Sequence, residues 1–264
     1  MCLEVGGFFA VAAGICKYFA VIDTRRIQTI QDAGSLRPSA FAREGECLYK
    51  VCSGKFHSEN PIKLPLINNP ALIGRVRVTE SEEHTRTVWR YNPNLKMNIP
   101  HTETYYTHNT LVDRFYWVNG KVTVGSIQLD FSHAHKAAWE NFQYKKRFFS
   151  PKEAKSPQLQ AQVSFPVRSG AFNYKVSTEY LPNKVDAIAI GEFKEIGRGT
   201  GWIFQKPTHQ LEFKLIAGTC DDYLRRLNTR CRVKNISAFV FGAVAVGCIG
   251  HEILQQWENS KNTT

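Results

Sequence analysis

ISAFVFGAVAVGCIGHEIL, residues 236–254, is the stretch that decides how this chain is organised. From Ile236 to Gly250 every residue is apolar or small, and basic residues crowd the upstream side: Arg225, Arg226, Arg230, Arg232 and Lys234. A helix over the full stretch would be about 28 Å long, close to the thickness of the hydrocarbon core of a bilayer. The pattern predicts a transmembrane helix over residues 235–257.

The beginning of the chain repeats this pattern. Residues 5–22 read VGGFFAVAAGICKYFAVI, and Arg25 and Arg26 follow. A cleaved signal peptide is the alternative, but Glu4 precedes the apolar run without any Lys or Arg, and no clear cleavage site follows it. We therefore expect a retained anchor, and a second transmembrane helix over residues 5–22.

The part between the two apolar segments, residues 23–234, is polar and basic. The net charge of the 264 residues is +11; the five charges outside this part sum to −1, so the part itself carries +12. Such a segment is too charged to enter lipid and long enough to bury a core as one domain. The fold class that we predict is α+β, a mainly β-rich domain flanked by two transmembrane helices.

Local patterns place the elements of this domain. Alternating apolar and polar residues predict strands at 48–55, 71–79, 85–91, 102–107, 174–180, 187–193, 201–205 and 211–216. Asn119-Gly120 within residues 111–124 predicts a tight β-hairpin. Residues 133–149 have a helix-like pattern, either touching lipid or packed on the sheet. We expect a polar connector without a long helix at 23–43, a loop at 150–170, and a helix capped by Thr219.

The positive charge indicates what the chain would bind. A basic domain beside a membrane favours anionic lipids or an acidic protein partner. Nucleic acid is disfavoured, because no nucleic-acid-binding motif is present and the aromatic residues follow strand periodicity.

No recognisable catalytic or metal-binding pattern is present. The glycine-rich run Gly197–Gly201 precedes a strand rather than a helix, so a β-turn is favoured over a phosphate-binding loop. His133 and His135 lack a nearby carboxylate or thiol that would complete a metal site. The seven cysteines form no CxxC motif; Cys47 and Cys52 could pair, but free thiols are favoured. We expect no catalytic residues, no cofactor and no metal.

Four runs in the second half resemble a known family. They are YKVSTEYLPN (174–183), AIAIGEF (187–193), GWIFQKP (201–207) and LEFKLIAGTCDDYLRRL (211–227). Together with a helix at each end, they resemble the "beside a membrane" domain of Mulan-type (GIDE) ubiquitin ligases of organellar membranes. Those ligases carry a zinc-binding RING finger after the second helix, whereas residues 255–264 contain no Cys or His. The resemblance therefore implies the anchoring domain without ligase activity or zinc ligands.

These observations lead to one expected function and two alternatives. We expect a non-enzymatic, membrane-anchored accessory or scaffold subunit of a mitochondrial membrane complex, for example a respiratory one. A RING-less regulatory partner of a membrane ubiquitin ligase is the first alternative, and an unrecognised enzyme or cofactor binder the second. The basic flanks favour a cytosolic or matrix-facing domain and the resemblance an intermembrane-space one, so its side and the choice of inner or outer membrane stay open.

Two sets of residues are expected to make contacts. Small residues four apart let helices approach closely, and we expect helix–helix interfaces at Gly6, Ala10, Gly14, Ala238, Gly242, Ala243 and Gly247. Basic residues next to the apolar segments should meet the phosphates of anionic lipids such as cardiolipin, namely Arg25, Arg26, Arg230, Arg232 and Lys234. Other membrane-protein subunits are the expected protein partners.

Overall fold

The structure, a computed structural model, describes residues 2–38, 43, 45–168, 170–197, 201–209 and 211–261. The chain forms two compact units: a helical unit, Met1–Ser35 with Gly218–Thr264, and a β-unit, Leu36–Ala217. The α+β class and the long apolar helix at each end of the chain are confirmed.

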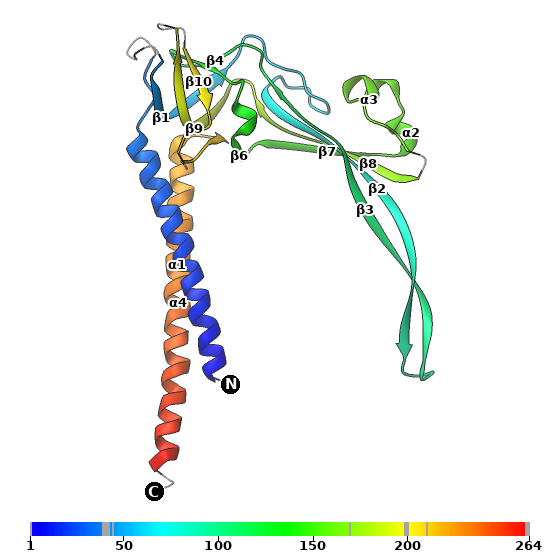
Figure 1. Ribbon diagram of the computed structural model, residues 1–264, viewed down its shortest axis with the longest axis vertical. Helices are drawn as coiled ribbons and strands as arrows, with labels where there is room; N and C mark the ends of the chain where they lie inside the picture. Colours follow the sequence, from blue (N-terminus) through cyan, green and yellow to red (C-terminus); the bar gives the residue numbers. More distant parts are fainter. Residues whose placement is uncertain are drawn as a thin grey trace. The chain divides into compact units, whose positions relative to one another are not determined.

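The helical unit is an antiparallel pair, α1 (Cys2–Ala33) and α4 (Cys220–Lys261), which lie side by side in Figure 1. Their 32 and 42 residues correspond to about 48 and 63 Å, longer than a hydrocarbon core. The prediction of a non-helical connector from residue 23 is wrong, because α1 continues to Ala33 and ends at Gly34, which has a positive φ of 63°. Thr219 caps α4 as predicted: its hydroxyl accepts a hydrogen bond from the Asp222 N–H at 3.2 Å.

The apolar parts of both helices leave large side chains uncovered. Phe8 is 70% exposed, Phe239 77% and Val246 73%. Water would penalise so much apolar surface, whereas lipid accommodates it. Both helices are long and apolar enough to cross a bilayer, which is compatible with a two-pass membrane protein.

Sheet A of the β-unit contains a closed ring of five strands: β1 (Cys47–His57), β4 (Lys121–Val124), β5 (Ile127–Asp130), β10 (Gly201–Gln205) and β9 (Val185–Ile196), which returns to β1. Only the β5–β10 pair of the ring is parallel. This is the arrangement of the small Greek-key barrels called OB-folds. Fully buried side chains fill the barrel, among them Phe56, Phe131, Phe193, Trp202 and Phe204. Strands β11 (Lys214–Ala217) and β6 (Ala138–Glu140) extend sheet A from β9.

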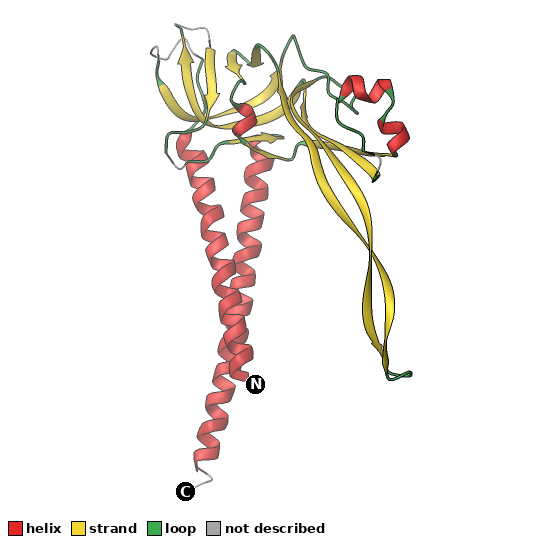
Figure 2. Ribbon diagram, turned by 45° about the vertical axis from the view of Figure 1, so that its right-hand side comes forward, coloured by secondary structure: helices red, strands yellow, loops and turns green. Residues whose placement is uncertain are grey.

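Sheet B has the strand order β3 (Met97–Trp117), β2 (Ala71–Asn92), β8 (Ala171–Pro182) and β7 (Gln143–Phe149). The strands expected at 71–79, 85–91 and 102–107 are parts of one long β2–β3 hairpin (Figure 1). The short helices α2 (Pro151–Ala154) and α3 (Pro157–Gln162) belong to the same part of the β-unit (Figure 2). Leu159 of α3 packs into a second core with Val76, Phe149 and Tyr174 of the sheet.

The predicted hairpin around Asn119-Gly120 is wrong. The strand before this turn, β3, pairs with β2 in sheet B, whereas the strand after it, β4, pairs with β1 and β5 in the barrel. The Val118 N–H donates to the Leu72 carbonyl at 2.9 Å, and the Val122 side chain is fully buried in the barrel core. The chain therefore passes from sheet B to the barrel at Asn119-Gly120. Burial of apolar side chains before and after this turn outweighs the local tendency of the two strands to pair with each other.

The predicted helix over residues 133–149 is also wrong. Only a 3₁₀ turn, η2 (Ala134–Lys136), is helical there, and β6 and β7 follow. Strand β7 pairs with β8 over its whole length, from Gln143 opposite Tyr180 to Phe149 opposite Tyr174. The loop predicted at 150–170 contains α2 and α3. Ser150 and Ser156 cap these helices, each followed by a proline in the first turn.

Candidate functional site

A groove of about 1000 Å³ lies in the β-unit beside strand β7. Three segments line it: the loop 63–68, the strand residues Lys145, Lys146, Arg147 and Phe149, and residues 153–162 of α2 and α3. Leu64, Phe149 and Leu159 are nearly fully buried and form its apolar side. We call this cavity the basic groove.

Specific contacts hold the walls of the basic groove. The Thr178 hydroxyl of β8 donates to the Pro65 carbonyl at 2.9 Å, which fixes the loop 63–68 to the sheet. Ser150 and Glu153 form a capping box at the start of α2. The Gln160 side-chain amide donates to the Ala154 carbonyl at 2.8 Å, which ties α3 to α2. The groove is therefore built by ordered segments.

The groove is strongly basic. Lys63, Lys145, Lys146 and Arg147 line it, against a single acidic residue, Glu153. The Glu153 carboxylate accepts from the Ser150 N–H at 2.8 Å, and this bond holds its pKa below the ordinary value. The Glu153 carboxylate is hydrogen-bonded within the helix cap. An anionic ligand in the groove would therefore meet an excess of positive charge.

Strand β7 presents an open edge to this groove. It is the last strand of sheet B and pairs with β8; no other strand pairs with it in the part of the chain that the structure describes. Every residue from Gln143 to Phe148 is exposed. The outward N–H and C=O groups of an edge strand can receive an additional extended strand. A basic groove beside an open edge suits an extended acidic segment.

The helix contact involves only part of the predicted small-residue set. Gly6 packs against α4, since a Cβ added there would approach Ile249 Cγ1 to 3.0 Å, and Ala238 is half-buried. Ala10, Gly14, Ala243 and Gly247 are exposed, and a Cβ added at Gly14, Gly242 or Gly247 would meet nothing within 4 Å. Their contact with a helix outside this chain stays a prediction.

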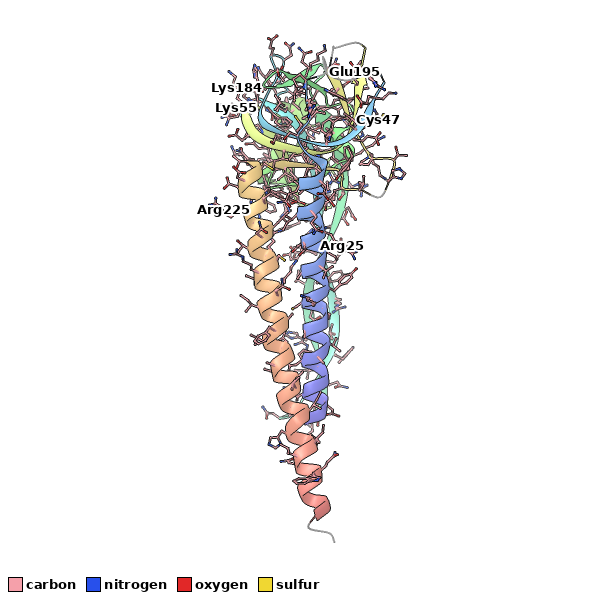
Figure 3. All side chains as sticks on the ribbon, turned by 90° about the vertical axis from the view of Figure 1, so that its left-hand side faces the viewer. Arg25, Cys47, Lys55, Lys184, Glu195 and Arg225 are labelled. Carbon is pink, nitrogen blue, oxygen red and sulfur yellow. The ribbon has the colours of Figure 1, made fainter. Side chains whose placement is uncertain are left out.

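The basic residues predicted to meet lipid differ in their surroundings. Arg25, Arg230 and Arg232 are exposed; Arg25 and Arg225 are labelled on the two helices in Figure 3. Lys234 instead forms an ion pair with Asp23, with 2.5 Å between Nζ and Oδ2, and Arg26 lies 3.6 Å from the same carboxylate. Asp23, their partner, was not among the residues predicted to make contacts. Lipid contacts of all five residues stay predictions.

The histidines and the glycine-rich run form no metal-binding or phosphate-binding site among the described residues. Among the described residues, no three His, Cys, Asp or Glu side chains cluster as metal ligands would. The His135 ring stacks on Trp117, with 4.8 Å between the ring centroids, and contacts the Ser132 carbonyl. Within the glycine-rich run, residues 198–200 lie outside the described part, and Gly201 begins strand β10 as expected.

Comparisons with known protein families, with curated proteins and with solved structures find no match for this chain. The resemblance to the organellar ubiquitin ligases therefore stays a prediction. A barrel of the OB type does not assign a function by itself, because unrelated functions share such folds.

Proposed function

We propose that this protein is a non-enzymatic accessory or scaffold subunit of a membrane complex. Helices α1 and α4 anchor it, and the β-unit provides the surface that contacts other subunits. The observation that carries the proposal is the basic groove beside the open edge of β7.

The partner of this groove is an extended acidic segment of another membrane-protein subunit. Such a segment would extend sheet B by pairing with the outer edge of β7, and main-chain hydrogen bonds would supply affinity. The groove cations would select acidic side chains, and Arg147, whose guanidinium lies 5.0 Å from the centroid of the Phe149 ring, is already oriented by that contact.

The membrane is a mitochondrial one, and the complex a respiratory or comparable assembly. The resemblance to the organellar anchoring domain supports this location. Cardiolipin is the anionic lipid for the exposed Arg25, Arg230 and Arg232. Fractionation of mitochondria, followed by protease treatment of intact and outer-membrane-stripped organelles, tests the location and the side on which the β-unit lies.

Co-purification of the full chain from mild detergent, with mass spectrometry of its partners, tests the function. The variant Lys145→Glu/Arg147→Glu reverses two groove charges. Lys152→Glu/Lys155→Glu is the matched control, because it also reverses two charges and both lysines are exposed outside the groove lining. We expect the groove variant to lose membrane subunits that the wild type and the control retain.

Equal recovery by all three proteins would overturn the assignment of the groove. Recovery of a RING protein in place of other subunits would favour the alternative function, a regulatory partner of a membrane ubiquitin ligase. Migration of the wild type only as a free monomer would contradict the scaffold proposal itself.

A further inference from the structure

The β2–β3 hairpin extends well beyond the sheet to which it belongs. Pairing of β2 with β8 ends at Glu82, whereas pairing of β2 with β3 continues to Asn92 opposite Met97. Residues 83–106 therefore form a two-stranded arm (Figures 1 and 2), about 33 Å long at the usual rise per strand residue. No third strand pairs with this arm in the described part of the chain. Beyond Glu82 the arm therefore lacks the neighbouring strand that sheet B gives to the first part of β2, and an additional contact would stabilise it.

Large apolar side chains gather at the end of the arm. Trp89 is 65% exposed, Tyr91 64%, Leu95 61% and Met97 56%. Within residues 88–100, which we call the tip, the charged residues are Arg90 and Lys96, and no acidic residue occurs. Glu103, just outside the tip, forms ion pairs with both Arg86 and Arg90. The tip is thus apolar, aromatic and cationic.

Apolar side chains lie on both faces of the tip. The strand register places Trp89 opposite Pro100 on one face, and Arg90 opposite Ile99 and Asn92 opposite Met97 on the other. Leu95 lies in the turn between the strands. A groove on a protein would cover one face of the hairpin, whereas the interfacial layer of a bilayer surrounds an inserted tip. Trp, Tyr, Lys and Arg are also the residues that membrane interfaces enrich.

We propose that the tip inserts into the interfacial layer of an anionic bilayer, as a third membrane contact in addition to α1 and α4. This goes beyond the scaffold function, because it names lipid as the ligand of a segment that belongs to neither the groove nor the helices. Lys96 would meet lipid phosphates while Trp89, Tyr91 and Leu95 enter among the upper acyl carbons, and Arg90 keeps its ion pair with Glu103 at the level of the headgroups.

Bromine quenching of tryptophan fluorescence tests the proposal on the full chain in lipid nanodiscs. Subtracting the signal of Trp89→Phe from that of the wild type isolates Trp89. The control is Trp117→Phe, since Trp117 lies at the other end of β3, stacked on His135. With lipids brominated near the headgroup end of the acyl chains, we expect the Trp89 signal to lose most of its intensity and the Trp117 signal to stay unchanged. Replacing the anionic lipids by zwitterionic ones should weaken the quenching.

Two outcomes would overturn the proposal. Quenching of Trp89 by aqueous iodide without quenching by bromolipid would show a tip in water, and protection from both quenchers would show a tip enclosed by protein, either a second copy or another subunit. Leu95→Glu provides an independent test at an exposed turn position, and retention of full bromolipid quenching in that variant would equally contradict insertion.

Discussion

Lys234 Nζ lies 2.5 Å from Asp23 Oδ2, so an ion pair joins the two long helices where their apolar parts end. The Asp23 side chain is 4% exposed. Six residues before Asp23, Lys17 Nζ donates to the side-chain carbonyl of Asn235, the residue after Lys234, at 3.1 Å. These polar contacts favour one register of the antiparallel pair, because a shift of either helix would separate the buried Asp23 from Lys234.

Asp23→Ala is expected to destabilise the helical unit by about 1–3 kcal/mol, since it removes a charge-assisted hydrogen bond and leaves Lys234 partly solvated. Unfolding of the detergent-solubilised full chain, followed by circular dichroism, measures the loss. Asp32→Ala, at an exposed position near the end of α1, is the control. The double variant Asp23→Ala/Lys234→Ala should lose less than the two single losses added together; strict additivity would show that the pair contributes no coupling.

Gly6→Leu is expected to weaken the helix pair by about 1–3 kcal/mol, because the new side chain would press on Ile249, Cys248 and the Ala245 carbonyl, which lie 3.0–3.4 Å from its Cβ. Gly14→Leu should leave the pair unchanged, since nothing lies within 4 Å of that position. Thermal unfolding of both variants in the same detergent makes the comparison. Equal losses would show that Gly6 is not packed against α4.

The seam between the helices shows how much the sequence could predict. Two apolar helices, their spans and the β-rich part between them follow from hydropathy and alternation. The contact face does not follow from small residues four apart. Instead, one series of buried and half-buried positions on each helix is spaced alternately by three and four residues: Gly6, Phe9, Ala13, Cys16, Ala20, Asp23, Ile27 and Ile30 on α1, and Leu227, Cys231, Lys234, Ala238, Phe241, Ala245, Cys248 and Glu252 on α4. This 3.5-residue period is that of a left-handed coiled coil, from which a four-residue repeat drifts away.

The basic groove could not be predicted from the sequence, for a different reason. The short run of aromatic and basic residues around Lys145 and Arg147 fits both the helix period and the strand period, and only pairing with β8 makes it a strand. Lys63, from a proline-rich loop, enters the groove through a tertiary contact that no local pattern encodes. The Ser-Pro pairs at 150–151 and 156–157 were a usable signal for the helices that line it.

The Asp113 carboxylate gives sheet B a pH-dependent contact. Arg75 donates to it through Nε at 2.6 Å and Nη2 at 2.5 Å, and Arg77 adds a third bond at 3.3 Å. The hydrogen bonds from Arg75, opposed by partial burial, lower the pKa of Asp113. With a native-state pKa below the unfolded value, the contribution to stability is complete above about pH 4 and is lost as the pH falls through the lowered pKa.

Asp113→Asn is therefore expected to cost about 0.5–1 kcal/mol near neutral pH, a modest figure because water screens a pair that is a third exposed. The difference from the wild type should shrink toward zero as the pH falls below about 4, since Asp113 is then neutral in both states. Denaturant titrations at several pH values measure it, with the exposed Asp186→Asn as control. A difference that persists unchanged in acid would contradict an electrostatic origin.

Cys47 and Cys52 of β1 should behave as two unconnected thiols. Both are free. They lie five positions apart along β1, which corresponds to about 16 Å and places them on opposite faces, too far apart for a disulfide. Cys52 lies in the barrel core, where burial raises its pKa to about 12. Cys47 lies at the start of β1 and is largely exposed (Figure 3). The pKa of its thiol is raised, first by the small part of the group that is buried and second by the negative charge of Glu192.

Maleimide labelling of the native full chain, with peptide mapping by mass spectrometry, should modify Cys47 and leave Cys52 unmodified until denaturant is added. Glu192→Gln should speed the labelling of Cys47 at neutral pH, because it removes a negative charge that disfavours the thiolate, whereas Glu179→Gln on β8 should not. Native labelling of Cys52 as fast as that of Cys47 would mean that the barrel opens readily. A peptide joining the two cysteines after mild oxidation would require β1 to leave its pairing with β9, because the strand itself holds their sulfur atoms apart.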